Sequence, residues 1–193
     1  MSRLAKFDRD LVLERAMQAF WDQGYCSTSV ATLTKTTQLN PGSIYAAFES
    51  KQGLFLATLD HYGKRSVEEI TQTLNSAETP LEGIRELFRQ LATNVKNPES
   101  ERSCFLVNTV LDTSRHNSMV RERVNHYFDL IESGFSNALV SAQDNGELAI
   151  DKNPRTLATF IMTTIWGLRV LLVTGADQDK VESVLDQLFI LLD

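Results

Sequence analysis

Residues 28–51, TSVATLTKTTQLNPGSIYAAFESK, predict two short helices joined by a tight turn. Thr28 and Ser29 are both able to cap the first helix, because a hydroxyl oxygen accepts hydrogen bonds from the unpaired N–H groups of a first turn. Val30 and Leu33 then fall on one face at helical spacing. The first half of the stretch therefore predicts a short amphipathic helix.

The second helix of the stretch begins at Asn40 and Pro41, where an N-cap residue precedes a proline at the first helical position. Ile44 and Phe48 are expected to pack inward. The outward face then carries small or hydrogen-bonding side chains, namely Gly42, Ser43, Tyr45, Ala46 and Ala47. Such a face suits DNA, because small residues let a helix approach base edges and hydroxyl groups donate to phosphates.

Residues 8–23 predict a third helix in front of this pair, and Gly24 ends it as a C-cap glycine does. Its apolar residues repeat at helical spacing and form one stripe: Val12, Ala16, Ala19 and Phe20. On pattern alone, a small helical subdomain without a ligand is the alternative to a DNA-binding unit.

The residues between Ala19 and Lys51 resemble the N-terminal domain of the TetR/AcrR family of bacterial transcription regulators. The resemblance implies an all-α homodimer. In that arrangement, residues 1–52 form a three-helix helix-turn-helix DNA-binding domain, and residues 53–193 form a helical ligand-binding and dimerisation domain. The implied partners are a double-stranded DNA operator, a second copy of the chain and a small-molecule inducer, and repression is the family's commonest mode.

Carried onto this sequence, the resemblance implies phosphate contacts from Thr28, Tyr45 and Lys51, and base contacts near Ser43. The expected DNA-binding residues are Thr28, Ser29, Asn40, Pro41, Gly42, Ser43, Tyr45, Ala46, Ala47 and Lys51. Pro41 stands where many members have lysine, and Ala46 and Ala47 stand where many have polar residues. We therefore expect sparse base readout and a larger share for thymine methyl groups or DNA shape.

Charge is divided unevenly along the chain, whose net charge is −6. Residues 1–65 hold eight Lys and Arg against six Asp and Glu, whereas residues 66–193 hold eleven against nineteen. Arg3, Lys6 and Arg9 are expected to reach along a DNA backbone, although an ordinary solvated tail is the alternative. The acidic remainder argues against a non-specific architectural DNA binder.

Composition predicts a soluble cytoplasmic protein. We expect no membrane span, because no run of about 18 apolar residues stands out, and the N-terminus lacks a signal-peptide core. Two cysteines, Cys26 and Cys104, do not make a disulfide framework, which fits a reducing compartment.

The rest of the chain also predicts helices, with no period-two strand pattern. The expected ranges are 53–74, 80–95, 103–115, 118–145, 154–175 and 177–192. Apolar residues spread widely around the last two helices, which predicts a dimer interface containing Ile165, Leu168, Leu172, Leu185, Leu188 and Phe189. The alternative is that both helices are buried within one chain. A twofold dimer would place two recognition helices about 34–36 Å apart, so the operator should be an approximate inverted repeat.

Cys104 is the candidate sensor. Its expected place at a helix start, after Arg102, favours the thiolate, and the segment is similar to one in a family branch whose members sense electrophiles or oxidants through a cysteine. Glu99 and Glu101 oppose that shift, and simple burial is the preferred interpretation. For a reversible inducer, the expected pocket lies between the middle helices and is lined by Phe88, Leu91, Cys104, Asn108, Tyr127, Phe128, Ile131 and Trp166. Each of these is also a reasonable core residue.

An enzyme is not predicted. The three histidines show no paired zinc-ligand spacing, and no phosphate-binding loop or nucleophile elbow is present in the sequence. A Cys104–His116 pair would be held about 18 Å apart along one helix. We therefore expect no catalytic residue, cofactor or metal site.

Overall fold

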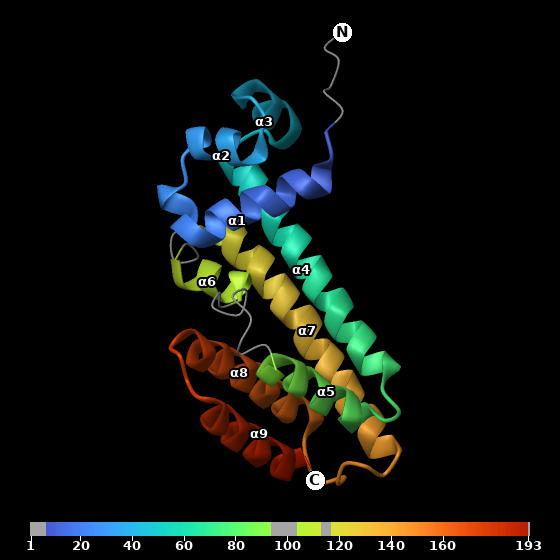
Figure 1. Cartoon of the computed structure of the whole chain (residues 1–193). Helices are drawn as coiled ribbons and strands as arrows, with labels where there is room; N and C mark the ends of the chain where they lie inside the picture. The colour runs from blue at the N-terminus through green and yellow to red at the C-terminus, as the bar shows by residue number, and fades with distance from the viewer. Residues whose placement is uncertain (1–6, 94–103, 113–116, 193) are drawn as a thin grey trace. The chain divides into compact units, whose positions relative to one another are not determined.

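The structure, a computed structural model, describes residues 7–93, 104–112 and 117–192 (Figure 1). Those residues form nine α-helices, which confirms the predicted all-α class. They divide into two compact units: unit 1 comprises residues 1–65 and 105–126, and unit 2 comprises residues 66–104 and 127–193.

Unit 1 holds the predicted three-helix segment. Its elements are α1 (Arg9–Ser27), α2 (Val30–Thr37), α3 (Pro41–Phe48), the first half of α4 (Lys51–Ser76), α6 (Phe105–Asp112) and the first turns of α7 (Ser118–Asp144). Asp8 caps α1, because its carboxylate accepts the Leu11 N–H at 3.1 Å. The predicted apolar stripe of α1 is buried, and Leu13 and Met17 are buried with it.

The corner between α3 and α4 requires glycine at position 53. A Cβ added to Gly53 would lie 1.9 Å from the Phe48 carbonyl oxygen, and backbone at that point cannot move aside cheaply. The Gly53 N–H donates to Ser50 Oγ at 2.9 Å, which secures the first turn of α4. The corner therefore fixes the end of α3 against the start of α4.

Unit 2 contains α5 (Pro80–Thr93), α8 (Pro154–Val173), α9 (Gln178–Leu192) and the later parts of α4 and α7. One face of α5 is apolar and packs inward, because Leu81, Ile84 and Phe88 are buried and Leu87 and Leu91 are partly buried. The core of unit 2 continues through buried residues of α7, α8 and α9, among them Phe135, Leu139, Ile161, Met162, Val181 and Leu192.

Helix boundaries agree with the expected ranges to within a few residues. The helix expected over 103–115 is α6 (Phe105–Asp112), and positions 113–115 lie outside the described residues. The predicted end of the fifth helix at position 95 also lies outside them. α8 stops at Val173, two residues short of the predicted end, because a turn begins at Thr174 and Gly175 adopts φ +75°.

α8 corrects the expectation that no stretch is apolar enough for a membrane span. By length and composition alone, Pro154–Val173 is long and apolar enough to cross a membrane, and only 28% of its most apolar 18-residue stretch is buried. Such a result is weak evidence for a membrane span, because core helices of soluble proteins have the same length and composition. Low burial of an apolar helix shows instead that much of its surface remains open.

Candidate DNA-binding surface and ligand pocket

The turn between α2 and α3 is held by hydroxyl groups. Ser29 caps α2 by accepting the Thr32 N–H at 3.0 Å. At the other end, the buried Thr37 donates to the Leu33 carbonyl at 2.6 Å and accepts the Leu39 N–H at 3.3 Å. Gln38 adopts the left-handed conformation that ends the helix. Three residues thus join two helices in a compact helix-turn-helix arrangement.

α3 begins and packs as the sequence predicts. Asn40 Oδ1 accepts the Ser43 N–H at 2.8 Å, and Pro41 occupies the first turn. Ile44 and Phe48 are buried. The rest of the helix faces outward to differing degrees: Pro41, Gly42, Tyr45 and Ala46 are exposed, and Ser43 and Ala47 are half-buried. This face offers small side chains and the hydroxyls of Ser43 and Tyr45.

Thr28 has an internal role in the structure and is badly placed for the expected phosphate contact. Its side chain is fully buried, and its hydroxyl donates to the Gly24 carbonyl at 2.7 Å, with the Ala19 carbonyl at 3.2 Å. Its N–H also donates to the Gly24 carbonyl. Thr28 therefore closes the end of α1, while the neighbouring Ser29 is exposed and caps α2.

Lys51 lies at the start of α4, against the end of α1. Its ammonium group is 4.5 Å from the centre of the Tyr25 ring and donates to the Cys26 carbonyl at 3.4 Å. Burial raises the pKa of Tyr25 above its ordinary value, and the nearby Cys26 adds to this, so the phenol is neutral at neutral pH. Lys51 is half-buried, and its charge lies beside the helix pair.

The expected basic arm is described only in part. Arg9 places its guanidinium 4.7 Å from the centre of the Phe48 ring at the end of α3. Arg3 and Lys6 lie outside the described residues. Lys35, exposed in the last turn of α2, adds a positive charge that the sequence analysis did not single out.

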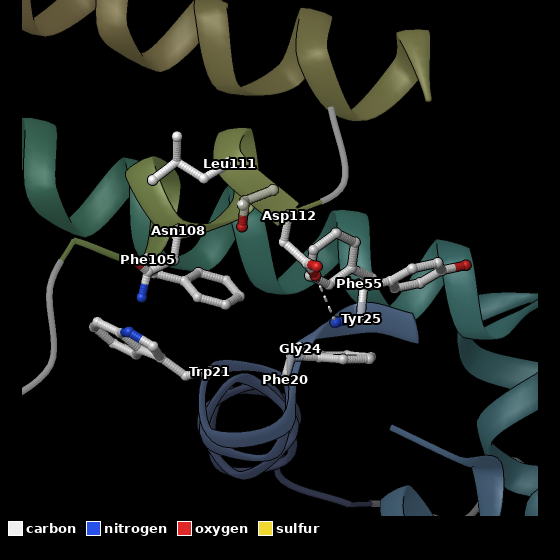
Figure 2. A pocket seen from close by; sticks show the side chains of 10 residues that line it. Phe20, Trp21, Gly24, Tyr25, Phe55, Phe105, Asn108, Leu111 and Asp112 are labelled. Atoms are coloured by element: carbon white, nitrogen blue, oxygen red, sulfur yellow. Dashed lines mark hydrogen bonds between the residues drawn. The ribbon is translucent and has the colours of Figure 1, made fainter. Parts of the chain in front are cut away.

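Unit 1 also contains a cavity of about 390 Å³ between α1, α4 and α6 (Figure 2). Its lining residues are Phe20, Trp21, Gly24, Tyr25, Phe55, Phe105, Asn108, Thr109, Leu111 and Asp112. The Asp112 carboxylate accepts the Tyr25 N–H at 3.3 Å, which ties the end of α6 to the end of α1 (Figure 2). The volume falls in the range of small-molecule sites.

The structure places the predicted sensor and inducer residues in different units. Asn108 lines the cavity in unit 1. Phe88, Tyr127, Phe128 and Trp166 belong to unit 2. There, the Phe128 and Trp166 ring centres are 4.8 Å apart, and Phe88 is buried with its ring centre 6.4 Å from that of Phe189.

Cys104 directly precedes α6 and is half-buried. Arg102, whose charge was expected to favour the thiolate, lies outside the described residues, as do Glu99 and Glu101. Cys26 is exposed at the end of α1, and neither thiol forms a disulfide within the described chain.

Half of the residues expected at a dimer interface are buried inside unit 2. Leu168, Leu185 and Leu188 are 1%, 6% and 2% exposed, so they pack within the chain. Ile165, Leu172 and Phe189 are half-buried against the same core. Burial by neighbouring helices explains the difference, because the sequence gives the apolar positions of a helix but not which of them face its own core.

The outer surface of α8 and α9 carries other apolar residues. Phe160, Val170, Val173, Ile190 and Leu191 are each between 41% and 65% exposed. A groove of about 320 Å³ lies between the two helices, and its lining residues are Phe160, Thr164, Lys180, Ser183, Val184, Gln187 and Leu188. Both features belong to unit 2.

Sequence reasoning missed three structural residues of unit 1. Thr37 fixes the turn before α3, Asp112 joins α6 to α1, and Trp21 brings a buried indole N–H to the cavity. A threonine in a last helical turn was a usable signal for Thr37, since its hydroxyl bonds the carbonyl four residues earlier. No sequence signal links Asp112 to residues 87 positions earlier.

Comparisons with known proteins agree with the helix-turn-helix geometry. Residues 12–58 match the bacterial regulatory proteins of the tetR family, and residues 80–188 match the tetracyclin repressor-like C-terminal domain. The HTH-type transcriptional regulator YezE of Bacillus subtilis is 26% identical, with both chains covered completely. The HTH-type transcriptional repressor ComR of Escherichia coli is 28% identical over 92% of this chain and 85% of its own length.

A solved structure of the TetR family regulator CifR also matches. That structure, a variant with three cysteines replaced and bound to 26-bp double-strand operator DNA, superposes with a TM-score of 0.87. It is 30% identical, and each chain is covered completely. The resemblance noted from residues 19–51 is thereby confirmed over both parts of the chain. The protein belongs to the TetR family of helix-turn-helix transcriptional regulators and is not an enzyme.

Proposed function

We propose that this protein is a homodimeric transcriptional repressor that binds an approximately palindromic operator and is released from it by an inducer or by cysteine modification. The exposed face of α3, held by the capped turn after α2, carries this proposal. It is supported by the operator complex of the related CifR and by the repressor function in the name of ComR. A cytoplasmic location follows from that function.

The proposed phosphate contacts come from the two ends of the helix pair. Ser29 and the N-terminus of α2 offer N–H donors, and the capped start of α3 offers more. Tyr45, 47% exposed, and Lys51 supply a hydroxyl and a positive charge. We assign the phosphate contact at this point to Ser29 instead of Thr28, because the Thr28 hydroxyl already donates to the Gly24 carbonyl within α1. Residues 1–52 remain the proposed DNA-binding segment.

The proposed reading face contains Asn40, Pro41, Gly42, Ser43, Ala46 and Ala47. Ser43 has a hydroxyl for base edges, while the two alanines can contact only methyl groups. Gly42 is constrained by its own cap, because a Cβ there would lie 3.3 Å from Asn40 Oδ1. We propose that half-site spacing and DNA shape supply much of the sequence preference.

The proposed dimer forms through the outer surface of α8 and α9. Exposed apolar residues beside a groove are typical of protein interfaces, and Phe160 belongs to both features. Ile165, Leu172 and Phe189 then contribute at the margin, whereas Leu168, Leu185 and Leu188 support the surface from inside. A twofold axis would give the two α3 helices the spacing of one DNA turn.

Two triggers remain proposed for release. A small-molecule inducer would act through a coupling free energy of about 1–3 kcal/mol. Modification of Cys104 is the alternative, since its thiol is only half-buried and lies just before α6. Comparing Cys104→Ser with the unchanged protein decides between them: if the serine variant still leaves the operator normally after oxidant, Cys104 is not the sensor.

The main test is selection of genomic DNA fragments by the purified protein, followed by electrophoretic shift assays on the best fragment. We expect an inverted repeat whose binding survives competition by random DNA. If random DNA competes for the protein as well as the selected fragment does, recognition is not sequence-specific and the protein is a non-specific binder. Ser43→Ala serves as the matched probe of base contact, because it removes only one half-buried hydroxyl from α3.

A further inference from the structure

The cavity of unit 1 contains a buried hydrogen-bond donor that the protein does not use. The Trp21 Nε1–H is inaccessible to solvent and has no acceptor among the residues that the structure describes. An unsatisfied buried N–H costs about 1–3 kcal/mol, so native proteins seldom leave one without a partner. Trp21 lines the cavity, so a bound molecule that displaces the side chains covering this N–H can supply the missing acceptor.

The other walls of the cavity are mainly aromatic. Five rings line it, from Phe20, Trp21, Tyr25, Phe55 and Phe105. They contact one another closely: the ring centres of Tyr25 and Phe55 are 4.8 Å apart, and those of Trp21 and Phe105 are 5.3 Å apart. Aromatic walls favour a planar aromatic ligand, because offset and edge-to-face ring contacts add to the burial of apolar area.

The polar groups limit the charge of such a ligand. Asp112 contributes a carboxylate to the lining and already accepts the Tyr25 N–H. An anionic ligand would be repelled by this group. A cationic ligand would be attracted to it, but an ammonium group offers no acceptor and leaves the Trp21 N–H unsatisfied. An uncharged ligand with an acceptor avoids repulsion by Asp112 and accepts the hydrogen bond from the Trp21 N–H.

We propose that this cavity is an effector site for small uncharged aromatic molecules with a hydrogen-bond acceptor, to which Trp21 Nε1 donates. Asn108 of α6 provides a second polar contact on the side of the cavity near Trp21 (Figure 2). The volume of about 390 Å³ accommodates a compound of two rings. Its effect on DNA rests on the function proposed above, whereas ligand binding itself does not.

The cavity touches the residues that support the helix pair. Tyr25 lines the cavity. Its ring also contacts Lys51, whose ammonium nitrogen is 4.5 Å from the ring centre. Tyr25 stands three positions before Thr28, whose hydroxyl closes the end of α1 against Gly24. Gly24, itself at φ +76°, also lines the cavity. A ligand that moves Tyr25 therefore acts on the segment leading into α2.

The binding test compares two probes of nearly equal shape on the full-length protein by calorimetry. Benzophenone has a carbonyl acceptor between two rings, and diphenylmethane has a methylene group there. We expect benzophenone to bind about five to ten times more tightly, the range for one net hydrogen bond. Equal affinity, or tighter binding of the cation benzyltrimethylammonium, would overturn the proposed ligand class.

Nuclear magnetic resonance of the indole N–H groups tests the donor directly. The chain has two tryptophans, and Trp166→Phe assigns their signals. Benzophenone should move the Trp21 signal and leave that of Trp166, which lies in unit 2, in place. If the Trp21 proton is already protected in the ligand-free protein and loses protection in Asn108→Ala, Asn108 is its internal acceptor and the proposal is wrong.

Trp21→Phe should remove the preference for benzophenone over diphenylmethane while keeping the affinity for diphenylmethane. If this variant does not fold, the comparison of benzophenone with diphenylmethane on the unchanged protein still tests the proposed hydrogen bond. With a selected operator fragment, saturating benzophenone should weaken DNA binding at least about fivefold. Ligand binding without that change would refute the effector role, and absence of sequence-selective DNA binding would instead refute the proposed function.

Discussion

The α2–α3 pair and the α8–α9 pair differ in what holds them and in what they leave exposed. Polar groups position the first pair, through the caps at Ser29 and Asn40 and the buried hydroxyl of Thr37. Apolar packing positions the second, yet its outer surface is apolar too, with Phe160 45% and Ile190 65% exposed. A small, polar outer face suits a hydrated and charged partner such as DNA, whereas exposed apolar side chains suit another protein surface.

The largest expected effect comes from Gly53→Ala, which disrupts the α3–α4 corner that supports the α2–α3 pair. The new Cβ would lie 1.9 Å from the Phe48 carbonyl oxygen, so the α3–α4 corner must open. We expect the free energy of unfolding to fall by more than about 3 kcal/mol. Urea titration followed by circular dichroism measures the change.

Gly134→Ala in α7 is the matched control. Its Cβ would find only Leu74 Cδ1, at 4.0 Å, which is ordinary contact. Alanine should stabilise that helix by up to about 1 kcal/mol, because glycine is the poorer helix former. Equal loss of stability in both variants would show that the close approach at Gly53 is relieved without cost.

Phe160→Asp should break the α8–α9 pair's contact with a second copy. A charge at the centre of an apolar interface costs at least about 2 kcal/mol, which is roughly a thirtyfold rise in the dimer dissociation constant. Sedimentation velocity measures that constant, and binding to a two-half-site operator should fall with it. Val140→Asp is the control, since Val140 of α7 is also 45% exposed. Dimers persisting in Phe160→Asp would place the interface elsewhere.

The two pairs were also unequally predictable from sequence. Caps are local, so Asn40 followed by Pro41 correctly located the start of α3, and the apolar spacing correctly buried Ile44 and Phe48. In α8 and α9, the sequence identified apolar helices but could not assign their faces, because burial depends on which helices pack against them. Leu168 and Leu185 accordingly lie in the core of unit 2 rather than on its surface.

Contacts between distant parts of the chain could not be predicted from the sequence, for a related reason. The cavity of unit 1 exists because α6 lies against α1 and brings Asp112 to the Tyr25 N–H. Asn108 was expected to line a pocket with Phe88 and Trp166, and sequence reasoning did not foresee that it lines the cavity of unit 1 with Trp21 and Phe105. Helical periodicity contains no information on such pairings, since it reports only which residues share one face.

Thr28→Val and Ser29→Ala separate structure from recognition at the start of the α2–α3 pair. Thr28→Val removes a buried hydroxyl bonded to the Gly24 carbonyl and should destabilise the fold by about 1–2 kcal/mol, without changing the operator affinity of folded protein. Ser29→Ala removes an exposed cap, should cost about 1 kcal/mol, and should weaken operator binding as well. Thermal unfolding and electrophoretic shifts measure the two effects, and the reverse pattern would restore Thr28 as a phosphate contact.

The smallest expected effect concerns Lys51, whose charge rests on the Tyr25 ring and the Cys26 carbonyl in the DNA-free chain. If the ammonium group turns to a phosphate in the complex, Lys51→Gln removes one released counterion, and the slope of log affinity against log salt becomes shallower by about 0.9. Lys64→Gln is the control, because Lys64 is exposed on the same helix about 20 Å further along. An unchanged slope in Lys51→Gln would mean that this lysine stays on Tyr25 and supports the helix pair from behind, in which case the positive charge at the DNA surface must come from Lys35 and Arg9.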